Sequence, residues 1–296
     1  MRLKSIISQL SDRRWRRFYF QRRFMRPRLR QWVTSRIATS RAEPAPGPPD
    51  PRAEALRDVG LVNLGPLLTP QQCEEIRRYF QQKDVLDHYR PDWPPFSPDG
   101  EGRHPACHVA AHLDPDVIAA PYLLALANDP RIIDMLHHYF GCRPVISFLT
   151  AWWSYPTGEG PQQAESFHRD VDDWSFIKLF VYLTDVGAES GPHVYVRSSA
   201  GSTSLDEIKR YPDEEVFEAF GRQSVAVQIA KAGSAFIENT FGLHKGTPVE
   251  RGTRLMFQAV YSLNPLPYGP RRPIAPFDDH LAGDAAARRL NRVYLG

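Results

Sequence analysis

Residues 167–170 read Phe-His-Arg-Asp, which is the pattern in this 296-residue sequence that could most directly do chemistry. If the segment is a strand, residues i and i+2 point to the same face, so His168 and Asp170 could bind one object together. An imidazole and a carboxylate placed in this way suit a divalent transition metal. A His-x-Asp pair also arises by chance as a surface ion pair, so a metal site requires a third ligand from elsewhere in the chain.

A second segment, residues 233–248, offers that ligand. A short apolar run leads into a glycine-containing turn, which then presents His244. His168, Asp170 and His244 would form the two-histidine, one-carboxylate set that binds iron on one face and leaves three octahedral positions open. Arg254 begins the next apolar run, and its guanidinium could hold a co-substrate carboxylate through two parallel hydrogen bonds.

Several other titratable residues bear on such a site. Asp172 shares the strand parity of Asp170, so it is a rival metal ligand if the strand continues. With Asp173 it could instead form the rim or bind a basic group of a substrate, and a solvated turn is also open. Lys178 interrupts an apolar run and would point either to the interior or to a strand edge. The histidines between residues 104 and 138 are interpreted as surface or packed residues, not as a second metal site.

The elements that must position these residues change character along the chain. Thr69, Pro70 and Gln72 predict a helix start with a capping box, and Gly141 predicts a helix end. From residue 143 the apolar runs become strand-like and are separated by Gly and Pro, which is typical of an all-β barrel or jelly roll preceded by helices. Helices are expected after Thr69, over 117–127, from Asp129 to Gly141 and within 204–221, and strands over 61–64, 145–153, 176–183, 193–196, 225–229, 235–238 and 254–263.

Basic charge is concentrated at the start of the chain. Residues 1–41 hold thirteen Lys and Arg and one acid, Asp12, although the formal net charge of the whole chain is only +3. This basic arm is expected to be flexible or helical, and its interleaved arginines and aromatic residues could touch an anionic membrane peripherally. Residues 42–53 are expected to form a proline-rich linker, and residues 54–296 a single domain. No specific nucleic-acid partner is expected.

Composition limits the class of protein further. No run of about eighteen apolar residues is present, which argues against a transmembrane helix. Three cysteines without CxxC spacing argue against a disulfide framework and a cysteine zinc site. We therefore expect a cytoplasmic protein, with membrane-peripheral placement, or a mitochondrial one for a eukaryotic source, as alternatives that depend on the arm.

Between about residue 55 and residue 265, the sequence resembles the phytanoyl-CoA dioxygenase family of Fe(II)- and 2-oxoglutarate-dependent oxygenases. The resemblance implies a fold that is mainly β with flanking helices: a double-stranded β-helix, also called a jelly roll or cupin-like fold. The motifs that carry it are residues 60–64, 168–170, 178–185 and 189–193, and His244 with Arg254.

The resemblance also implies residue roles. The three metal-ligand candidates match the iron ligands of the family, and Arg254 matches the arginine that binds the 5-carboxylate of 2-oxoglutarate. Thr150 falls near a family contact with this co-substrate. Relatives often carry a small hydroxyl residue two positions after the distal histidine, where this sequence has Gly246, so Thr247 is the candidate substitute.

The implied activity is hydroxylation of a small organic molecule or acyl substrate with Fe(II), 2-oxoglutarate and O2, releasing succinate and CO2. Asp170 favours hydroxylation, because halogenating relatives replace this carboxylate with a small residue. Two alternatives stay open: a zinc-dependent hydrolase that uses the same His-Asp-His set, and a catalytically idle relative that acts as a binding or scaffold protein. Succinate formation that depends on Fe(II) would separate the oxygenase from both.

Overall fold

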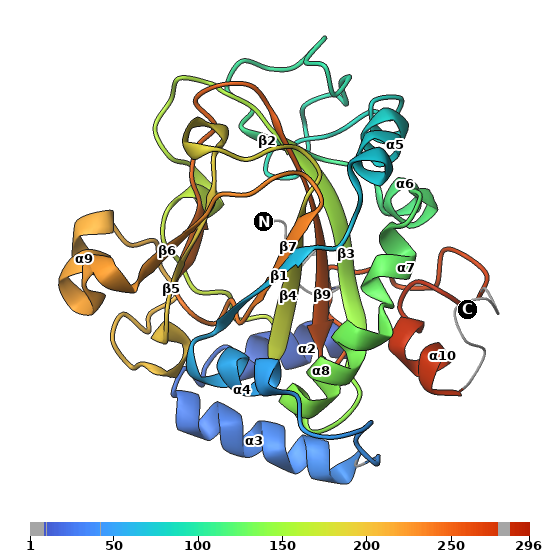
Figure 1. Cartoon of the computed structure of the whole chain (residues 1–296), viewed down its shortest axis with the longest axis vertical. Coiled ribbons are helices and arrows are strands. Elements are labelled where there is room, and N and C mark those ends of the chain that lie inside the picture. The colour runs from blue at the N-terminus through green and yellow to red at the C-terminus, as the bar shows by residue number, and fades with distance from the viewer. Residues whose placement is uncertain (1–8, 10, 42, 278–284) are drawn as a thin grey trace.

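Two antiparallel β-sheets enclose the interior of the molecule (Figure 1). The computed structural model describes residues 9, 11–41, 43–277 and 285–296. The larger sheet has six strands in the order β1-β7-β4-β9-β3-β2, and the smaller sheet has three in the order β6-β5-β8. The strands are β1 (Leu61–Pro66), β2 (Val109–Ala111), β3 (Val145–Ser154), β4 (Phe176–Tyr182), β5 (His193–Val196), β6 (Val225–Gln228), β7 (Ser234–Glu238), β8 (His244–Gly246) and β9 (Arg254–Ser262).

The fold is a mainly β jelly roll with flanking helices, as the sequence predicts. Alternation along the strands gives the larger sheet two different faces. On β4, Leu179 and Val181 join the main hydrophobic core, whereas Lys178 and Phe180 line the cavity between the sheets. One face of this sheet therefore anchors the fold, and the other presents side chains to the interior.

Helices cover the outer face of the larger sheet, and one lies beside the smaller sheet (Figure 1). The predicted capping box at Thr69 is confirmed, since its side chain accepts from the Gln72 N–H and the Gln72 side chain accepts from the Thr69 N–H. The predicted helix end at Gly141 is also confirmed, with φ of 73° in the left-handed region that favours glycine. The helices of the body are α4 (Pro51–Asp58), α5 (Pro70–Phe80), α6 (Asp114–Ala119), α7 (Leu123–Ala127), α8 (Pro130–Phe140), α9 (Asp213–Phe220) and α10 (Ala285–Asn291).

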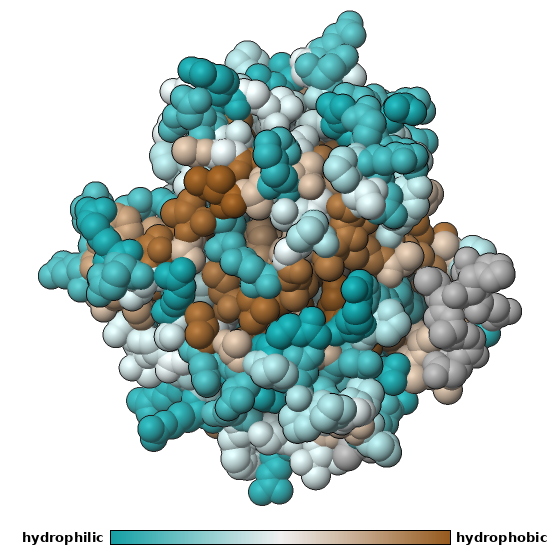
Figure 2. All heavy atoms as spheres, viewed as in Figure 1, coloured by the Kyte–Doolittle hydropathy of each residue, from teal (hydrophilic) through white to brown (hydrophobic). Residues whose placement is uncertain are grey.

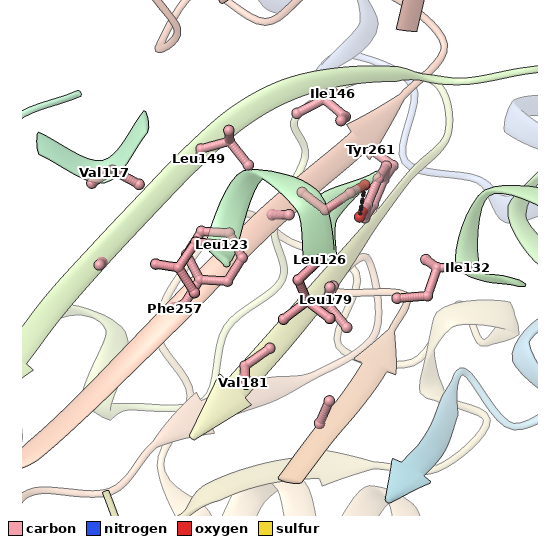
Figure 3. Close-up of a cluster of buried hydrophobic side chains, with 14 of the residues drawn as sticks. Val117, Leu123, Leu126, Ile132, Ile146, Leu149, Leu179, Val181, Phe257 and Tyr261 are labelled. Atoms are coloured by element: carbon pink, nitrogen blue, oxygen red, sulfur yellow. Dashed lines mark hydrogen bonds between the residues drawn. The ribbon is translucent and has the colours of Figure 1, made fainter. Parts of the chain in front are cut away.

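The main core lies between these helices and the larger sheet, as the close-up in Figure 3 shows. Leu123 of α7 belongs to the same buried cluster as Leu179 of β4 and Phe257 of β9. Burial of one such leucine contributes about 2 kcal/mol to the free energy of unfolding. The Tyr261 hydroxyl donates to the Ala127 carbonyl at 2.8 Å, so the end of α7 is also tied to β9. These contacts fix the strands whose opposite face lines the cavity.

The expected continuous helix over 117–127 is wrong. The chain breaks between α6 and α7, where Pro121 disfavours a helical backbone at Ala120, whose ψ is 138°. Tyr122 follows with φ of 66°. The helix expected within 204–221 is limited to α9, and Pro212 stands directly before its first residue. In both places a proline sets the boundary that apolar spacing alone does not indicate.

The described part of the basic arm contains the helices α2 (Arg13–Gln21) and α3 (Pro27–Ser40), which lie below the sheets in Figure 1. Arg17 and Arg41 both donate to the Asn264 side chain, at 3.2 and 2.8 Å, in the loop after β9. In Figure 2 apolar surface gathers across the middle of the molecule, whereas the lower edge, where α3 lies, is mostly hydrophilic. No helix among the described residues is long and apolar enough to cross a membrane.

Candidate metal centre

His168 and His244 are brought together by a backbone bridge. The His168 N–H donates to the His244 carbonyl, and the His244 N–H donates to the His168 carbonyl, each at 3.0 Å. Residues that exchange both hydrogen bonds in an antiparallel pair lie directly opposite each other, so their side chains share a face. His168 thus adds an isolated bridge beside β8, and the two imidazole centroids are 4.3 Å apart.

Hydrogen bonds to the main chain fix the orientation of both rings. His168 Nδ1 lies 2.9 Å from the Ser166 carbonyl, and His244 Nδ1 lies 3.0 Å from the Gly242 carbonyl. A carbonyl oxygen only accepts, so Nδ1 carries a proton in each ring, and in a neutral ring Nε2 keeps the lone pair. This arrangement, in which the second nitrogen is anchored by a backbone carbonyl, is typical of histidine ligands to metals.

Asp170 completes the cluster. Its backbone N–H donates to the Thr240 carbonyl at 2.9 Å, and its carboxylate lies 3.6 Å from His168 Nε2 and 3.2 Å from His244 Nε2. One ligand atom from each of these three residues lies within 4.8 Å of the others. Among the described residues, they form the one group of three or more His, Cys, Asp or Glu side chains that meets this distance.

The electrostatics of the cluster favour a cation. Burial and the neighbouring His244 lower the pKa of His168 to about 3, so this ring is neutral at pH 7. Burial alone would raise the pKa of Asp170, but Lys178 and His244 hold it well below the usual range. For His244, burial is outweighed by the Asp170 carboxylate, which raises the pKa of the ring. An ionised carboxylate beside imidazoles with anchored Nδ1 atoms is a suitable donor set for a divalent transition metal.

Lys178 points to the interior, which settles the two orientations left open by the sequence. Its Nζ donates to Asp170 at 2.6 Å and lies 3.2 Å from the Asp172 carboxylate. Burial opposes the charged form, but the two carboxylates raise the pKa of Lys178. The lysine therefore holds the oxygen of Asp170 that also faces His244, and it ties Asp172 to the same corner of the cavity.

Arg254 stands at the start of β9, opposite Ser154 of β3. One guanidinium nitrogen, Nη2, donates to the Ser154 hydroxyl at 2.9 Å. Within the described chain, the buried Nε and Nη1 atoms have no hydrogen-bond partner, although the side chain lines the cavity. A buried charged group with unpartnered donors is unfavourable unless a ligand completes it. Burial lowers the pKa of Arg254, but an arginine stays protonated, so these donors are available to an anion.

Gly246 lies beside the Arg254 guanidinium, with room for a Cβ atom at ordinary contact distance. A Cβ atom at Gly246 would lie 3.6 Å from Arg254 Nη2 and 3.9 Å from Nη1. Thr150, in the middle of β3, lines the cavity. Thr247 is not among the residues that line it, because its hydroxyl donates to the Pro192 carbonyl at 2.9 Å. The structure thus brings Thr150 and Arg254 to the cavity and directs Thr247 elsewhere.

The cavity between the sheets has a volume of about 920 Å³ and contains the His-Asp-His cluster at its wall. Asp172 lines it and accepts a hydrogen bond from the Tyr268 hydroxyl at 3.2 Å. Asp173 instead accepts from the Asn264 backbone N–H at 2.7 Å, outside the cavity lining. A large part of the wall is apolar, and its members include Phe148, Trp152, Phe180, Met256, Val260 and Tyr268.

One buried pair was missed by the sequence reasoning. His193 of β5 lines the cavity, and its Nε2 lies 2.7 Å from Glu238 Oε1 on β7. Burial raises the pKa of Glu238 to about 8, and its second oxygen has no partner within the described chain. The signal available in the sequence was Glu238, a charged residue at the end of the apolar run 235–238. A charged residue is common at the end of a strand, so this signal did not indicate a buried pair.

Two further histidines of the cavity wall, His108 and His112, make hydrogen bonds within the protein. His108 pairs with Glu165 through Nδ1 at 2.8 Å and with the Thr157 hydroxyl through Nε2 at 2.8 Å. His112 Nε2 accepts from the Trp153 indole N–H at 3.1 Å. Both rings line the cavity but use these nitrogens for protein contacts, so they are packed residues, as the sequence analysis favours.

Comparisons with known proteins place the fold. No family model matches the sequence, and no curated protein matches it. Solved structures do match, and one is the epimerase SnoN from nogalamycin biosynthesis, in complex with Fe3+, alpha ketoglutarate and nogalamycin RO. It has 18% sequence identity and a TM-score of 0.50, over 72% of this chain and 84% of that chain.

Two further structures agree. HygX from Streptomyces hygroscopicus, with nickel and 2-oxoglutarate bound, has 14% identity and a TM-score of 0.50 over 84% of this chain and 98% of that chain. EctD from S. alaskensis, with bound Fe, has 16% identity and a TM-score of 0.50 over 75% of this chain and 79% of that chain. At these identities the likeness establishes a shared jelly-roll fold.

Proposed function

We propose that this chain is an Fe(II)- and 2-oxoglutarate-dependent dioxygenase that hydroxylates a small organic or acyl substrate, with release of succinate and CO2. The observation that carries the proposal is Arg254, whose two unpartnered guanidinium nitrogens are buried in the same cavity wall as the metal-ligand candidates. A zinc hydrolase has no evident need for this arginine, whereas a dicarboxylate co-substrate does.

The donor set fits iron. Two imidazoles and one carboxylate on one side of the ion leave positions for a bidentate co-substrate and for O2. His168, Asp170 and His244 would hold Fe(II), which when bound supplies the oxidative chemistry coupled to decarboxylation of 2-oxoglutarate. The Nδ1 bonds of the two histidines keep their Nε2 atoms directed at the ion, so the protein orients its ligands before the metal arrives.

The other residues have binding and positioning roles. Arg254 would hold the 5-carboxylate of 2-oxoglutarate through its unpartnered guanidinium donors, while Nη2 donates to Ser154. Thr150 lines the wall beside this path and is a candidate co-substrate contact. The neighbours SnoN and HygX were solved with alpha ketoglutarate or 2-oxoglutarate, which supports the same co-substrate here.

The cavity supports a small-molecule substrate. Its volume of about 920 Å³ and its aromatic and aliphatic wall suit a compact organic molecule or an acyl group more than a polymer. Retention of Asp170 leaves no room for a halide among the ligands, which supports hydroxylation. Among the solved neighbours, HygX has also been solved with hygromycin B, and SnoN with nogalamycin RO.

The test is succinate formation. The protein is incubated with 2-oxoglutarate, O2 and a panel of small organic and acyl substrates, with either Fe(II) or Zn(II), and succinate is measured. We expect the wild-type protein to form succinate in the mixture with Fe(II) but not in the mixture with Zn(II). The His244→Ala variant should form none with either metal. Succinate formed equally with Zn(II) or by that variant would contradict the proposal. Tight Fe(II) binding without any succinate would favour the idle binding protein.

A further inference from the structure

Two main-chain carbonyls in the turn that follows Asp170 accept hydrogen bonds from the basic arm. Residues 171–175 lie outside the β-ladders, between the bridge at His168 and the start of β4. Gln21 Nε2 donates to the Val171 carbonyl at 2.7 Å, and Arg30 donates to the Asp173 carbonyl. Both donors are buried, with only 1% of Gln21 and 4% of Arg30 exposed. The carbonyls on either side of Asp172 are therefore satisfied by side chains from α2 and α3.

The same arm holds a second segment of the cavity wall. The ring of Tyr268 lies edge-on to Trp15 and Phe18 of α2, with centroids 6.2 and 5.4 Å away. On its other side, Tyr268 lines the cavity beside Phe148 and donates its hydroxyl to Asp172. The tyrosine is thus placed between the arm and the interior, and its hydroxyl meets the turn that Gln21 holds.

The loop that carries Tyr268 is also fixed by the arm. Arg14 Nη1 donates to the carbonyls of Gly269 at 3.1 Å and Pro270 at 2.8 Å. The opposite edge of the Arg14 side chain pairs with Asp12, the single acid of the arm. Two loops that are far apart in the sequence, after Asp170 and after β9, therefore meet on one pair of helices.

Arg30 is buried for a structural reason. Its guanidinium lies 4.6 Å from the Phe241 ring centroid and 5.6 Å from that of Trp174, and it also donates to the carbonyls of Gln21 and Phe24. Burial lowers the pKa of Arg30 to about 10, because the charged form is removed from water. A buried arginine is tolerated when its donors are used, so these contacts explain why a basic residue occupies this position.

We propose that the described arm is part of the catalytic unit, in which Gln21 and Arg30 are positioning residues for the turn that presents Asp170 and Asp172. Phe18 serves the same purpose for Tyr268 and so sets one wall of the substrate cavity. This inference rests on the proposed function of the His-Asp-His cluster. According to this inference the basic arm helps to build the site and is not a free tail.

The experiment measures Co(II) binding to the full chain, with Co(II) as the metal probe. Arg30→Met is compared with Arg36→Met, a matched control on the same helix, because Arg36 is exposed and its one described contact is the ring of Trp32 at 5.6 Å. The readouts are the Co(II) dissociation constant, the ligand-field absorption spectrum of bound Co(II), and the thermal unfolding midpoint. Loss of a residue that orients a metal ligand weakens metal binding by roughly 10-fold or more.

We expect Arg30→Met to weaken Co(II) binding by roughly 10-fold and to alter the absorption spectrum, whereas Arg36→Met matches the wild type. Arg30→Lys, which keeps the charge and one donor, should recover part of the spectrum. If Arg30→Met does not fold, Gln21→Met is measured instead. It removes the hydrogen bond to the Val171 carbonyl and should weaken Co(II) binding in the same way. A folded variant with wild-type affinity and spectrum would overturn the inference and leave the proposed function intact. A wild-type chain that does not bind Co(II) would overturn both.

Discussion

Replacing Arg254 with methionine should selectively abolish co-substrate binding. Methionine fills similar space but removes the two buried donors, Nε and Nη1, that have no partner within the described chain. A hydrogen bond to a charged group contributes about 1.5–3 kcal/mol, so loss of two such bonds costs about 3–6 kcal/mol. That corresponds to weakening of 2-oxoglutarate binding by about 100-fold to 10,000-fold. The fold should lose little, because the protein itself supplies one bond to this side chain, from Ser154.

Calorimetric titration of 2-oxoglutarate into Co(II)-loaded protein measures this effect, and Co(II) affinity is measured in parallel. Arg254→Lys should be intermediate, because an ammonium keeps the charge without the planar fork. Arg251→Met is the matched control, since Arg251 lies in the turn before β9 with 81% of its side chain exposed. Binding of 2-oxoglutarate by Arg254→Met at wild-type strength would refute the reasoning, and so would an equal loss in the Arg251→Met control.

Three further predictions follow from particular contacts. His244→Ala should abolish Co(II) binding while the circular dichroism spectrum stays native; retained stoichiometric binding would exclude His244 as a ligand. Gly246→Ser should tighten 2-oxoglutarate binding by roughly 2- to 10-fold, because a Cβ fits at 3.6 Å from Arg254 and the hydroxyl adds one donor; weaker binding would contradict the space assigned there. Burial lowers the pKa of His112 from 6.5 to about 4, so its neutral form stabilises the fold above pH 6.5 and this contribution is lost as the pH falls toward 4. Urea denaturation should show His112→Gln losing about 2 kcal/mol less than the wild type between pH 7 and pH 5, and identical losses would refute this.

The sequence predicted most of the strands and the identity of the clustered side chains. Apolar runs separated by Gly and Pro mark the strands of the larger sheet, because neither of its faces is open to solvent. One face packs against helices, and the other forms a wall of the cavity. His168 and Asp170 lie together as their spacing indicates, although isolated bridges at Phe167 and His168 and the Asp170–Thr240 hydrogen bond, and no regular strand, hold them. The backbone pairing with His244 is a long-range contact that local patterns do not encode.

The features that could not be predicted depend on tertiary contacts. The arginines and aromatic residues of the arm have the composition of a membrane-binding segment, yet Arg30 and Phe18 are buried against the body. Composition records which groups are present, but it does not tell which surface they meet. The place of Thr247 also depends on a tertiary contact: its hydroxyl donates to the Pro192 carbonyl, and the residue does not line the cavity although it is close to His244 in the sequence.

The most direct test of the account is anaerobic addition of Fe(II) and then 2-oxoglutarate to the full chain, followed by visible absorption. The account predicts a weak charge-transfer band that appears only when both are present and is lost in His244→Ala and in Arg254→Met. Such a band requires the co-substrate to chelate iron held by the His-Asp-His cluster. Binding of Fe(II) without this band, or a band that persists in both variants, would contradict the assignment of the site.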